Sequence, residues 1–237
     1  MKRQDQLVDY LVPYLTLFGE RVVSGDRNKK GKFIVFEGGE GTGKSTQAEL
    51  LYKYLKEKKI PTIITREPGG TNTSEEIRKL LVNGQIDKWD GISETLLHYA
   101  ARREHINNVI LPTLTTGTWV ICDRFYLSTS AYQGAGHGVN QKLLETLKKY
   151  VCEDLKPNLT FILDIKHEEA IKRISKRGKK NRYESFEKDF HNRVRNYFKN
   201  INCKQDNTHL LIDADQSIKI INKIIISSIN KSFLKNS

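Results

Sequence analysis

The 237-residue sequence lacks any apolar run close to the ~20 residues that a membrane-spanning helix needs. It also lacks the apolar segment of a signal peptide, because Asp5, Asp9 and Pro13 interrupt its N-terminus. Cysteine is scarce, with 3 scattered residues, no C-x-x-C pair and no His/Cys cluster of zinc-ligand spacing. These absences argue against a membrane, disulfide or zinc scaffold and favour the reducing cytoplasm.

Acidic residues are fewer than basic ones, 28 against 40, which gives a net charge of +12. A basic balance can indicate nucleic-acid binding. Here, however, the basic residues are spread along the chain, and no basic run is interleaved with aromatic residues for stacking. We therefore expect anionic small-molecule substrates and a lysine-rich solvated surface, and no nucleic-acid or membrane partner.

The stretch KFIVFEGGEGTGKST, from Lys32 to Thr46, is the most informative part of the sequence. Its apolar beginning predicts a buried strand, and helical spacing follows it, which is the context that distinguishes a phosphate-binding loop from a chance glycine-rich turn. Glycines permit positive φ, so that successive N–H groups can surround phosphate oxygens. The residues expected to bind ATP are Gly38, Gly39, Glu40, Gly41, Thr42, Gly43, Lys44, Ser45 and Thr46.

Two side chains are candidate Mg²⁺ ligands. The Ser45 hydroxyl follows the loop lysine, the usual position for a metal ligand in such loops. Asp123 follows a predicted strand over residues 118–122, and an acidic residue at that place suits the magnesium shell. A helix-capping role is the alternative for Asp123.

Predicted strands at 33–36, 61–65, 118–122, 159–164 and 209–213 alternate with predicted helices. This alternation predicts an α/β fold with a parallel sheet of five strands covered by helices on both faces. The helices are expected over 47–55, from a capping box of Thr73 and Glu76, over 93–114 with a bend at Pro112, and over 140–151, 167–177, 186–201 and 218–233.

The domain is expected to span residues 32–237, with a charged lid at about 174–186. Residues 1–31 form an N-terminal extension or linker that a phosphate-binding domain does not require. Two interpretations of it stay open: a disordered leader, or an arm that packs on the domain or on a partner.

Five motifs occur in order: FEGGEGTGKST, TREPGGT, AARREH, WVICDRF and STSAYQG. Together they resemble the bacterial thymidylate (dTMP) kinases, a family of P-loop nucleoside monophosphate kinases. The resemblance begins near Lys32 and continues to the C-terminal helix. It implies a three-layer, P-loop NTPase-like fold and a homodimer that uses ATP and Mg²⁺ to phosphorylate dTMP to dTDP, which supplies dTTP for DNA replication. Together with the scarce cysteines, we expect the enzyme to be cytoplasmic.

The resemblance also implies roles for individual residues. Glu40 would lie near the deoxyribose 3′-hydroxyl and Tyr132 against the 2′ position. Arg66, Arg78 and Arg124 would surround the acceptor phosphate, for which bidentate guanidinium contacts are well suited. The implied acceptor-binding residues are Arg66, Glu67, Arg78, His98, Arg102, Arg124, Thr129, Tyr132 and Gln133. The implied catalytic residues are Lys44, Glu40, Arg124, Arg177 and Arg182.

The sequence departs from the family pattern at two positions. His98 stands where the family usually has a phenylalanine that stacks on thymine; an imidazole can stack, or it can be a structural histidine. Asn181 stands where the lid usually has an aspartate, although Arg182 is retained. Because Glu40 occupies the loop position where another subtype has an arginine, the catalytic arginines are expected in the lid.

Two other functions would use the same phosphate loop. One is a P-loop kinase that acts on a nucleoside or on another monophosphate, and the other is a nucleotide-switch protein. The three arginines expected at the acceptor argue for a phosphorylated acceptor. A switch protein would hydrolyse its nucleotide without any monophosphate, so a single assay of ATP use separates these functions.

Overall fold

The computed structural model describes residues 30–178, 181–201 and 208–234, and the expectations for residues 1–29 lie outside this range. The strands are β1 (Phe33–Gly38), β2 (Thr62–Arg66), β3 (Trp119–Asp123), β4 (Leu159–Asp164) and β5 (His209–Asp213). The helices are α2 (Lys44–Glu57), α3 (Asn72–Val82), α4 (Gly91–His105), α5 (Leu111–Thr115), α6 (Tyr126–Thr129), α7 (Gln141–Cys152), α8 (His167–Arg177), α9 (Lys188–Lys199) and α10 (Ile218–Ile229). Short helical turns are η1 (Ile106–Ile110), η2 (Ser130–Gly136), η3 (Arg182–Ser185) and η4 (Asn230–Leu234).

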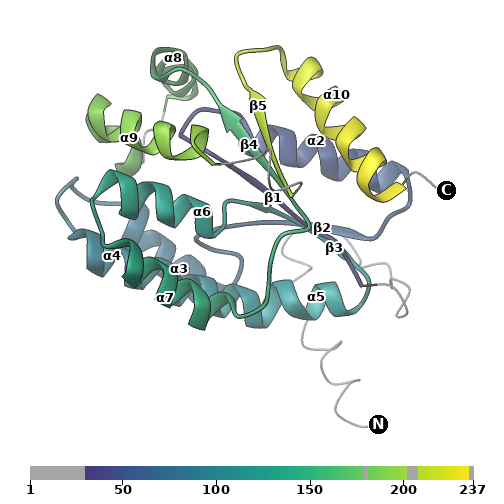
Figure 1. Ribbon diagram of the computed structural model, residues 1–237, viewed down its shortest axis with the longest axis horizontal. Coiled ribbons are helices and arrows are strands. Elements are labelled where there is room, and N and C mark those ends of the chain that lie inside the picture. Colours follow the sequence, from purple (N-terminus) through teal and green to yellow (C-terminus); the bar gives the residue numbers. More distant parts are fainter. Residues whose placement is uncertain (1–29, 179–180, 202–207, 235–237) are drawn as a thin grey trace, which may run out of the picture.

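The five strands form one parallel sheet in the order β2-β3-β1-β4-β5, which confirms the predicted sheet (Figure 1). The central strand β1 pairs Phe36 with Asp123 on one side and Gly38 with Leu163 on the other. Because all strands run in the same direction, their carboxyl ends meet at one edge of the sheet. Ligands of open α/β sheets bind at that edge.

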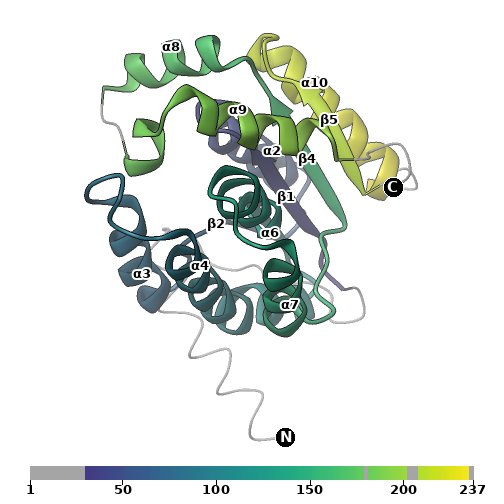
Figure 2. The same ribbon diagram turned by 60° about the vertical axis from the view of Figure 1, so that its left-hand side comes forward.

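Helices cover both faces of the sheet, as predicted. On one face, Phe36 packs in a cluster with Leu51 of α2 and Ile225 of α10. On the other, Val35 packs in a cluster with Ile110 of η1 and Cys152 of α7. Figure 2 shows α3, α4 and α7 on the side of the molecule opposite α10. β1 is therefore buried along its whole length and holds the loop that follows it against a fixed base.

Two predicted helices, the one after Thr71 and the one over 93–114, differ most from the structure. The capping box of Thr73 and Glu76 does not form, because Thr71 caps α3 instead: its Oγ1 accepts the Ser74 N–H at 3.0 Å. The single helix expected over 93–114 consists of α4, the π-helical turn η1 and α5. Pro112 lies in the first turn of α5, where a missing N–H costs little, so the chain changes its helical winding before the proline.

The other predicted elements agree closely with the structure. The predicted ranges of β4, β5 and α8 match the observed bounds, whereas the helix expected from residue 186 starts at Lys188, after the turn η3. Within residues 30–178, 181–201 and 208–234, no helix has both the length and the apolar character needed to cross a membrane.

Candidate active site

The phosphate loop follows β1 and ends in α2, as predicted. Gly38 has a φ of 133°, and a Cβ atom there would lie 2.3 Å from the Leu163 carbonyl oxygen. Only glycine allows β1 and β4 to approach so closely at this turn. Gly39 to Gly43 form the loop, and Lys44, Ser45 and Thr46 open the first turn of α2, so backbone N–H groups at a helix N-terminus are available for phosphate oxygens.

The Lys44 side chain is buried against the loop. Its Nζ donates to the Gly39 carbonyl oxygen at 2.6 Å. Burial, together with the nearby charge of Arg124, lowers the pKa of Lys44 to about 8. The lysine is therefore held inside the loop, and its positive charge is costly there unless an anion compensates it.

The two candidate metal ligands lie in contact. Ser45 Oγ donates to Asp123 Oδ2, while Asp123 Oδ1 is buried and has no hydrogen-bond partner in the part of the chain that the structure describes. That part holds no group of three or more His, Cys, Asp or Glu side chains able to bind a metal ion. A hydroxyl and one carboxylate fit Mg²⁺, which keeps several waters and takes its other ligands from substrate phosphates.

Arg124 links the phosphate loop to the segment after β3. Its guanidinium donates to the Gly38 carbonyl oxygen at 3.0 Å and to Glu40 Oε1 at 2.8 Å. Tyr132 Oη also donates to Glu40, at 3.1 Å. Burial raises the pKa of Glu40, but the charges of Arg124 and Lys44 outweigh it and hold that pKa below its usual value. Glu40 is therefore ionised at neutral pH.

The Arg124 backbone is strained, with a φ of 77° that non-glycine residues rarely adopt. Its N–H donates to the Phe36 carbonyl oxygen at 2.8 Å, which holds the residue to β1. Strain of this kind persists where surrounding contacts over-determine the backbone, and such residues cluster at functional sites. The contacts of Arg124 with β1, the loop and Tyr132 supply that constraint.

A second buried network lies behind the site. Glu67, which forms a cis peptide with Pro68, accepts from Arg102 Nε at 2.6 Å and contacts His105 Nδ1 at 3.1 Å. Arg102 also donates to Thr129 Oγ1 at 3.0 Å. Its Nη1 is buried and has no partner among the described residues. The structure thus brings Glu67, Arg102 and Thr129 together, with one guanidinium donor left over.

A pocket adjoins these groups. It is lined by predicted acceptor residues and by the segment that contains η3. The lining residues are Glu40, Glu67, Pro68, Arg78, Val82, His98, Arg124, Ser128, Tyr132, Gln133, Asn181 and Tyr183. The pocket therefore contains two cationic groups, Arg78 and Arg124, that can face an anion.

Arg66 lies outside this pocket. It forms an exposed pair with Glu75 at 3.2 Å, and 54% of its side-chain surface is accessible. Arg78, in contrast, lines the pocket and donates to the Pro68 carbonyl oxygen at 2.8 Å. Burial and the charge of Arg66 lower the pKa of Arg78. The two arginines thus approach the site differently, although the motif suggested equal roles.

Two functional candidates escaped the sequence analysis, Glu94 and Tyr183. Glu94 is fully buried and accepts from Gln133 Nε2 at 2.6 Å and from Arg182 Nη2. The available signal was the spacing of Glu94, His98 and Arg102, which are four residues apart and share one face of α4. Tyr183 carried no signal, because its contact with His98 spans 85 positions of the chain.

Arg182, one of the two predicted lid arginines, contacts α3 and α4 and not the phosphate loop. The Arg182 guanidinium is buried and binds Glu94 and the carbonyl oxygens of Leu81, at 2.9 Å, and Ile86, at 3.0 Å. It therefore anchors η3 to α3 and α4. Arg177 ends α8, but its side chain lies outside what the structure describes. A catalytic role for either residue stays a prediction.

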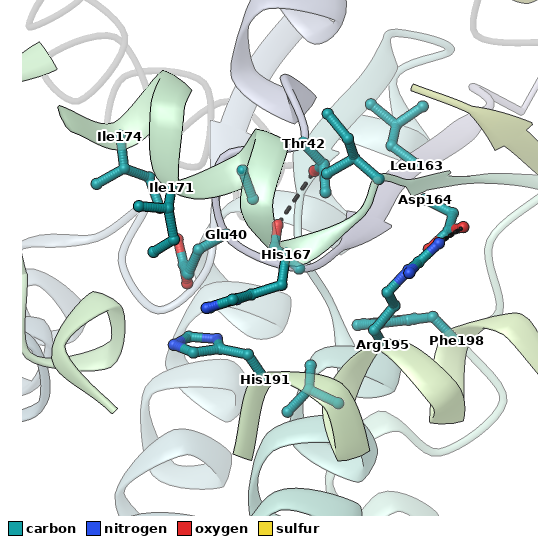
Figure 3. Close-up of a pocket in the computed structure, with 14 residues that line it drawn as sticks. Glu40, Thr42, Leu163, Asp164, His167, Ile171, Ile174, His191, Arg195 and Phe198 are labelled. Atoms are coloured by element: carbon teal, nitrogen blue, oxygen red, sulfur yellow. Dashed lines mark hydrogen bonds and ion pairs between the residues drawn. The ribbon is translucent and has the colours of Figure 1, made fainter. Parts of the chain in front are cut away.

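A second pocket lies on the other side of the phosphate loop, between α8 and α9 (Figure 3). His167 and His191 stack there with ring centroids 5.0 Å apart, and the figure shows the Glu40 carboxylate near their rings. Arg195 forms a bidentate pair with Asp164 at 2.6 and 2.8 Å. These contacts fix the beginning of α8 and the body of α9 to the end of β4.

Comparison with known proteins identifies relatives along most of the chain. A family model described as thymidylate kinase matches residues 36–225. The thymidylate kinase of Caulobacter vibrioides is 45% identical over 196 residues, which cover 83% of this chain and 94% of the relative. That of Magnetococcus marinus is 44% identical over 193 residues, covering 81% and 92%. A crystal structure of thymidylate kinase from Ehrlichia chaffeensis has a TM-score of 0.68 and 35% identity, covering 84% of this chain and 99% of that one.

Proposed function

Because the chain belongs to the thymidylate kinase family, we propose that it transfers the γ-phosphate of ATP to dTMP, forming dTDP for dTTP synthesis and DNA replication. The observation that carries this proposal is the position of Arg124. Its guanidinium contacts the phosphate loop at Gly38 and Glu40 and also lines the adjoining pocket. A donor phosphate in the loop and an acceptor phosphate in the pocket would therefore meet beside one guanidinium.

The acceptor pocket suits a thymine base as well as a phosphate. Gln133 Nε2 donates to the carboxylate of Glu94, so the amide oxygen is the free end of the side chain. That oxygen is buried and has no partner in the described residues. It can accept a hydrogen bond from a base N–H, which thymine offers at N3. A base with an acceptor at that position would leave two acceptors facing each other, which costs binding energy.

The chemistry requires little proton transfer. The attacking group is a phosphate oxygen, which is largely ionised at neutral pH, so no strong general base is needed. Catalysis then consists of positioning and charge stabilisation during in-line transfer. We assign charge stabilisation to Lys44 and Arg124, and acceptor orientation to Arg78, Glu40 and Gln133. The Arg124 pair holds the Glu40 carboxylate at the wall of the pocket, and we propose that this carboxylate faces the sugar of the acceptor.

We propose Mg²⁺ as the cofactor, held by Ser45 Oγ and the free carboxylate oxygen of Asp123. When bound, it would neutralise phosphate charge on ATP. Arg177 and Arg182 remain proposed lid arginines, Arg182 from a position in which it is now paired with Glu94. Asp123→Asn should raise the Mg²⁺ concentration needed for half-maximal turnover, while the affinity for dTMP should stay the same.

We further propose that the enzyme is a cytoplasmic homodimer. Support comes from α4, where Ile92 and Leu96 are 53% and 50% exposed and lie one helical turn apart, so that two large apolar side chains face outward together. Sedimentation velocity of the full chain tests this state. A dimer that Leu96→Glu converts to a monomer supports the proposal, and a monomeric wild type contradicts it.

A coupled assay of ATP consumption tests the reaction. We expect Mg²⁺-dependent turnover that dTMP stimulates strongly and that AMP, CMP and GMP do not. Stimulation by one of those other monophosphates alone would indicate a different nucleotide kinase. ATP hydrolysis that no monophosphate changes would indicate a nucleotide-switch protein.

A further inference from the structure

A hydrogen bond joins two walls of the acceptor pocket. His98 Nε2 of α4 and Tyr183 Oη of η3 lie 2.9 Å apart, and both residues line the pocket. Their ring centroids are 6.1 Å apart and the ring planes meet at 51°, so the contact is made through the polar atoms and not by stacking. The two residues are 85 positions apart in the chain.

The local structure fixes the Tyr183 side chain. Asn181 caps η3 by accepting from the Glu184 N–H at 3.1 Å, and Glu184 Oε2 accepts from the Asn181 N–H at 2.9 Å. The Tyr183 ring packs edge-on against Tyr132, with centroids 5.7 Å apart at 87°. Arg182, the preceding residue, is bound to Glu94 of α4. The phenol is therefore directed at His98 by neighbours on both sides.

Both partners are neutral at physiological pH. Burial and the charges of Arg102 and Arg124 hold the pKa of His98 well below its usual value. Burial and the charge of Glu94 raise the pKa of Tyr183 well above its usual value. The contact is thus a hydrogen bond between an imidazole and a phenol.

We propose that Tyr183 is a positioning residue for the acceptor: its hydroxyl holds the His98 imidazole in one orientation as a wall of the acceptor pocket. This inference rests on the proposed function, which makes that pocket the dTMP site. A phenylalanine at position 98 would supply an aromatic wall without any link to η3. The His98–Tyr183 pair ties that wall to the segment that closes the other side of the pocket.

The two partners can be removed singly or together, and the outcomes differ. Tyr183→Phe leaves the imidazole without its partner, and His98→Phe removes the imidazole from a buried hydroxyl that keeps Glu94 and Arg182 as its other polar neighbours. A buried polar group left unpaired is costly, whereas replacing both partners by apolar groups can be nearly neutral. We therefore expect each single substitution to raise the KM for dTMP about threefold to tenfold, while the double variant returns to within about twofold of the wild type.

The experiment measures kcat and KM for dTMP and for ATP in the wild type, both single variants and the double variant. Calorimetric titration with dTMP alone adds a dissociation constant that does not depend on turnover. The KM for ATP should stay constant, because the pair does not contact the phosphate loop. Tyr54→Phe is the matched control: Tyr54 Oη donates to Asn230 Oδ1 at 2.7 Å, and neither residue lines the pocket.

Each outcome has one interpretation. Single variants that weaken dTMP binding, with recovery in the double variant, support the proposal. Unchanged dTMP affinity in Tyr183→Phe contradicts it, and so do effects of the two substitutions that simply add. An inactive wild type would instead overturn the proposed function, and unchanged melting temperatures separate loss of positioning from loss of fold.

Discussion

The donor and acceptor sides of this active site are built differently. On the donor side, nine consecutive residues, Gly38 to Thr46, form the predicted phosphate loop, in which backbone N–H groups are available for phosphate oxygens. On the acceptor side, side chains from separate elements converge on one pocket. Arg124 is common to both sides. A loop made of backbone tolerates change in its surroundings, whereas a site made of converging side chains depends on how the helices pack.

Lys44→Met should produce the largest change and should be confined to the donor side. Removing a preorganised charge from a phosphoryl-transfer site lowers kcat by about 10²-fold to 10³-fold. Affinity for dTMP should change less than about twofold, because Lys44 does not line the acceptor pocket. Steady-state kinetics with calorimetric dTMP titration measures both quantities. Lys53→Met, an exposed lysine on the same helix, is the control; near-normal turnover of Lys44→Met would remove the loop from the chemistry.

Glu94→Gln should affect the acceptor side and the fold together. It leaves the Arg182 guanidinium buried without its carboxylate and frees the Gln133 amide to turn. Breaking a buried ion pair costs about 3–5 kcal/mol in the free energy of unfolding, which denaturant titration measures.

The control for Glu94 is Glu153→Gln. Glu153 pairs with Arg103 at the surface, where 60% of the glutamate side chain is exposed, and such pairs contribute about 0–1 kcal/mol. Equal losses in the two variants would mean that Glu94 does not organise the acceptor side.

Glu37 of β1 lies directly before the phosphate loop and contacts the segment after β3. Its titration should change the free energy of unfolding with pH. Its carboxylate accepts the Phe125 and Ser128 N–H groups at 2.9 and 3.2 Å, and burial raises its pKa from 4.5 to about 7. A raised pKa means that the folded state holds the proton more tightly than the unfolded state does. The protonated Glu37 therefore contributes fully to the free energy of unfolding below pH 4.5, and this contribution is lost as pH rises toward 7. Between pH 4.5 and 7, the free energy of unfolding of Glu37→Gln should therefore rise by up to about 3 kcal/mol relative to that of the wild type, as measured by denaturant titration. Parallel stability curves of the two proteins would show that Glu37 titrates normally.

The pH dependence of ATP binding should come from the donor side alone. Lys44 has a pKa of about 8, and bound phosphates favour its charged form. Binding above pH 8 then requires proton uptake, so ATP affinity should fall up to about tenfold per pH unit. The side chain of Lys44→Arg stays charged, so its ATP affinity should not change between pH 7.5 and 9.5, a range that covers the Lys44 pKa of about 8. The same slope in both proteins would assign the titration to another group.

Sequence pattern predicted the fold well wherever the signal was local. The alternation of strands and helices was enough for the parallel sheet, and the bounds of β4, β5 and α8 were correct. The start of α3 was missed by two residues because Thr71, and not Thr73, accepts the capping hydrogen bond. Helix ends depend on which of several competing caps forms, so local sequence decides them less firmly than it decides an apolar core strand.

The sequence by itself predicted the phosphate loop, because the glycines, the lysine and the serine, together with the apolar strand before them and the helix after them, are consecutive in the chain. Only the tertiary structure decided the partners of the buried polar side chains. It paired Arg182 with Glu94, 88 positions away, joined His98 to Tyr183, and left Arg66 at the surface. The physical reason is that a buried charge or hydrogen-bonding group must find a partner among whatever neighbouring elements bring within reach, and residue spacing along the chain does not encode that choice.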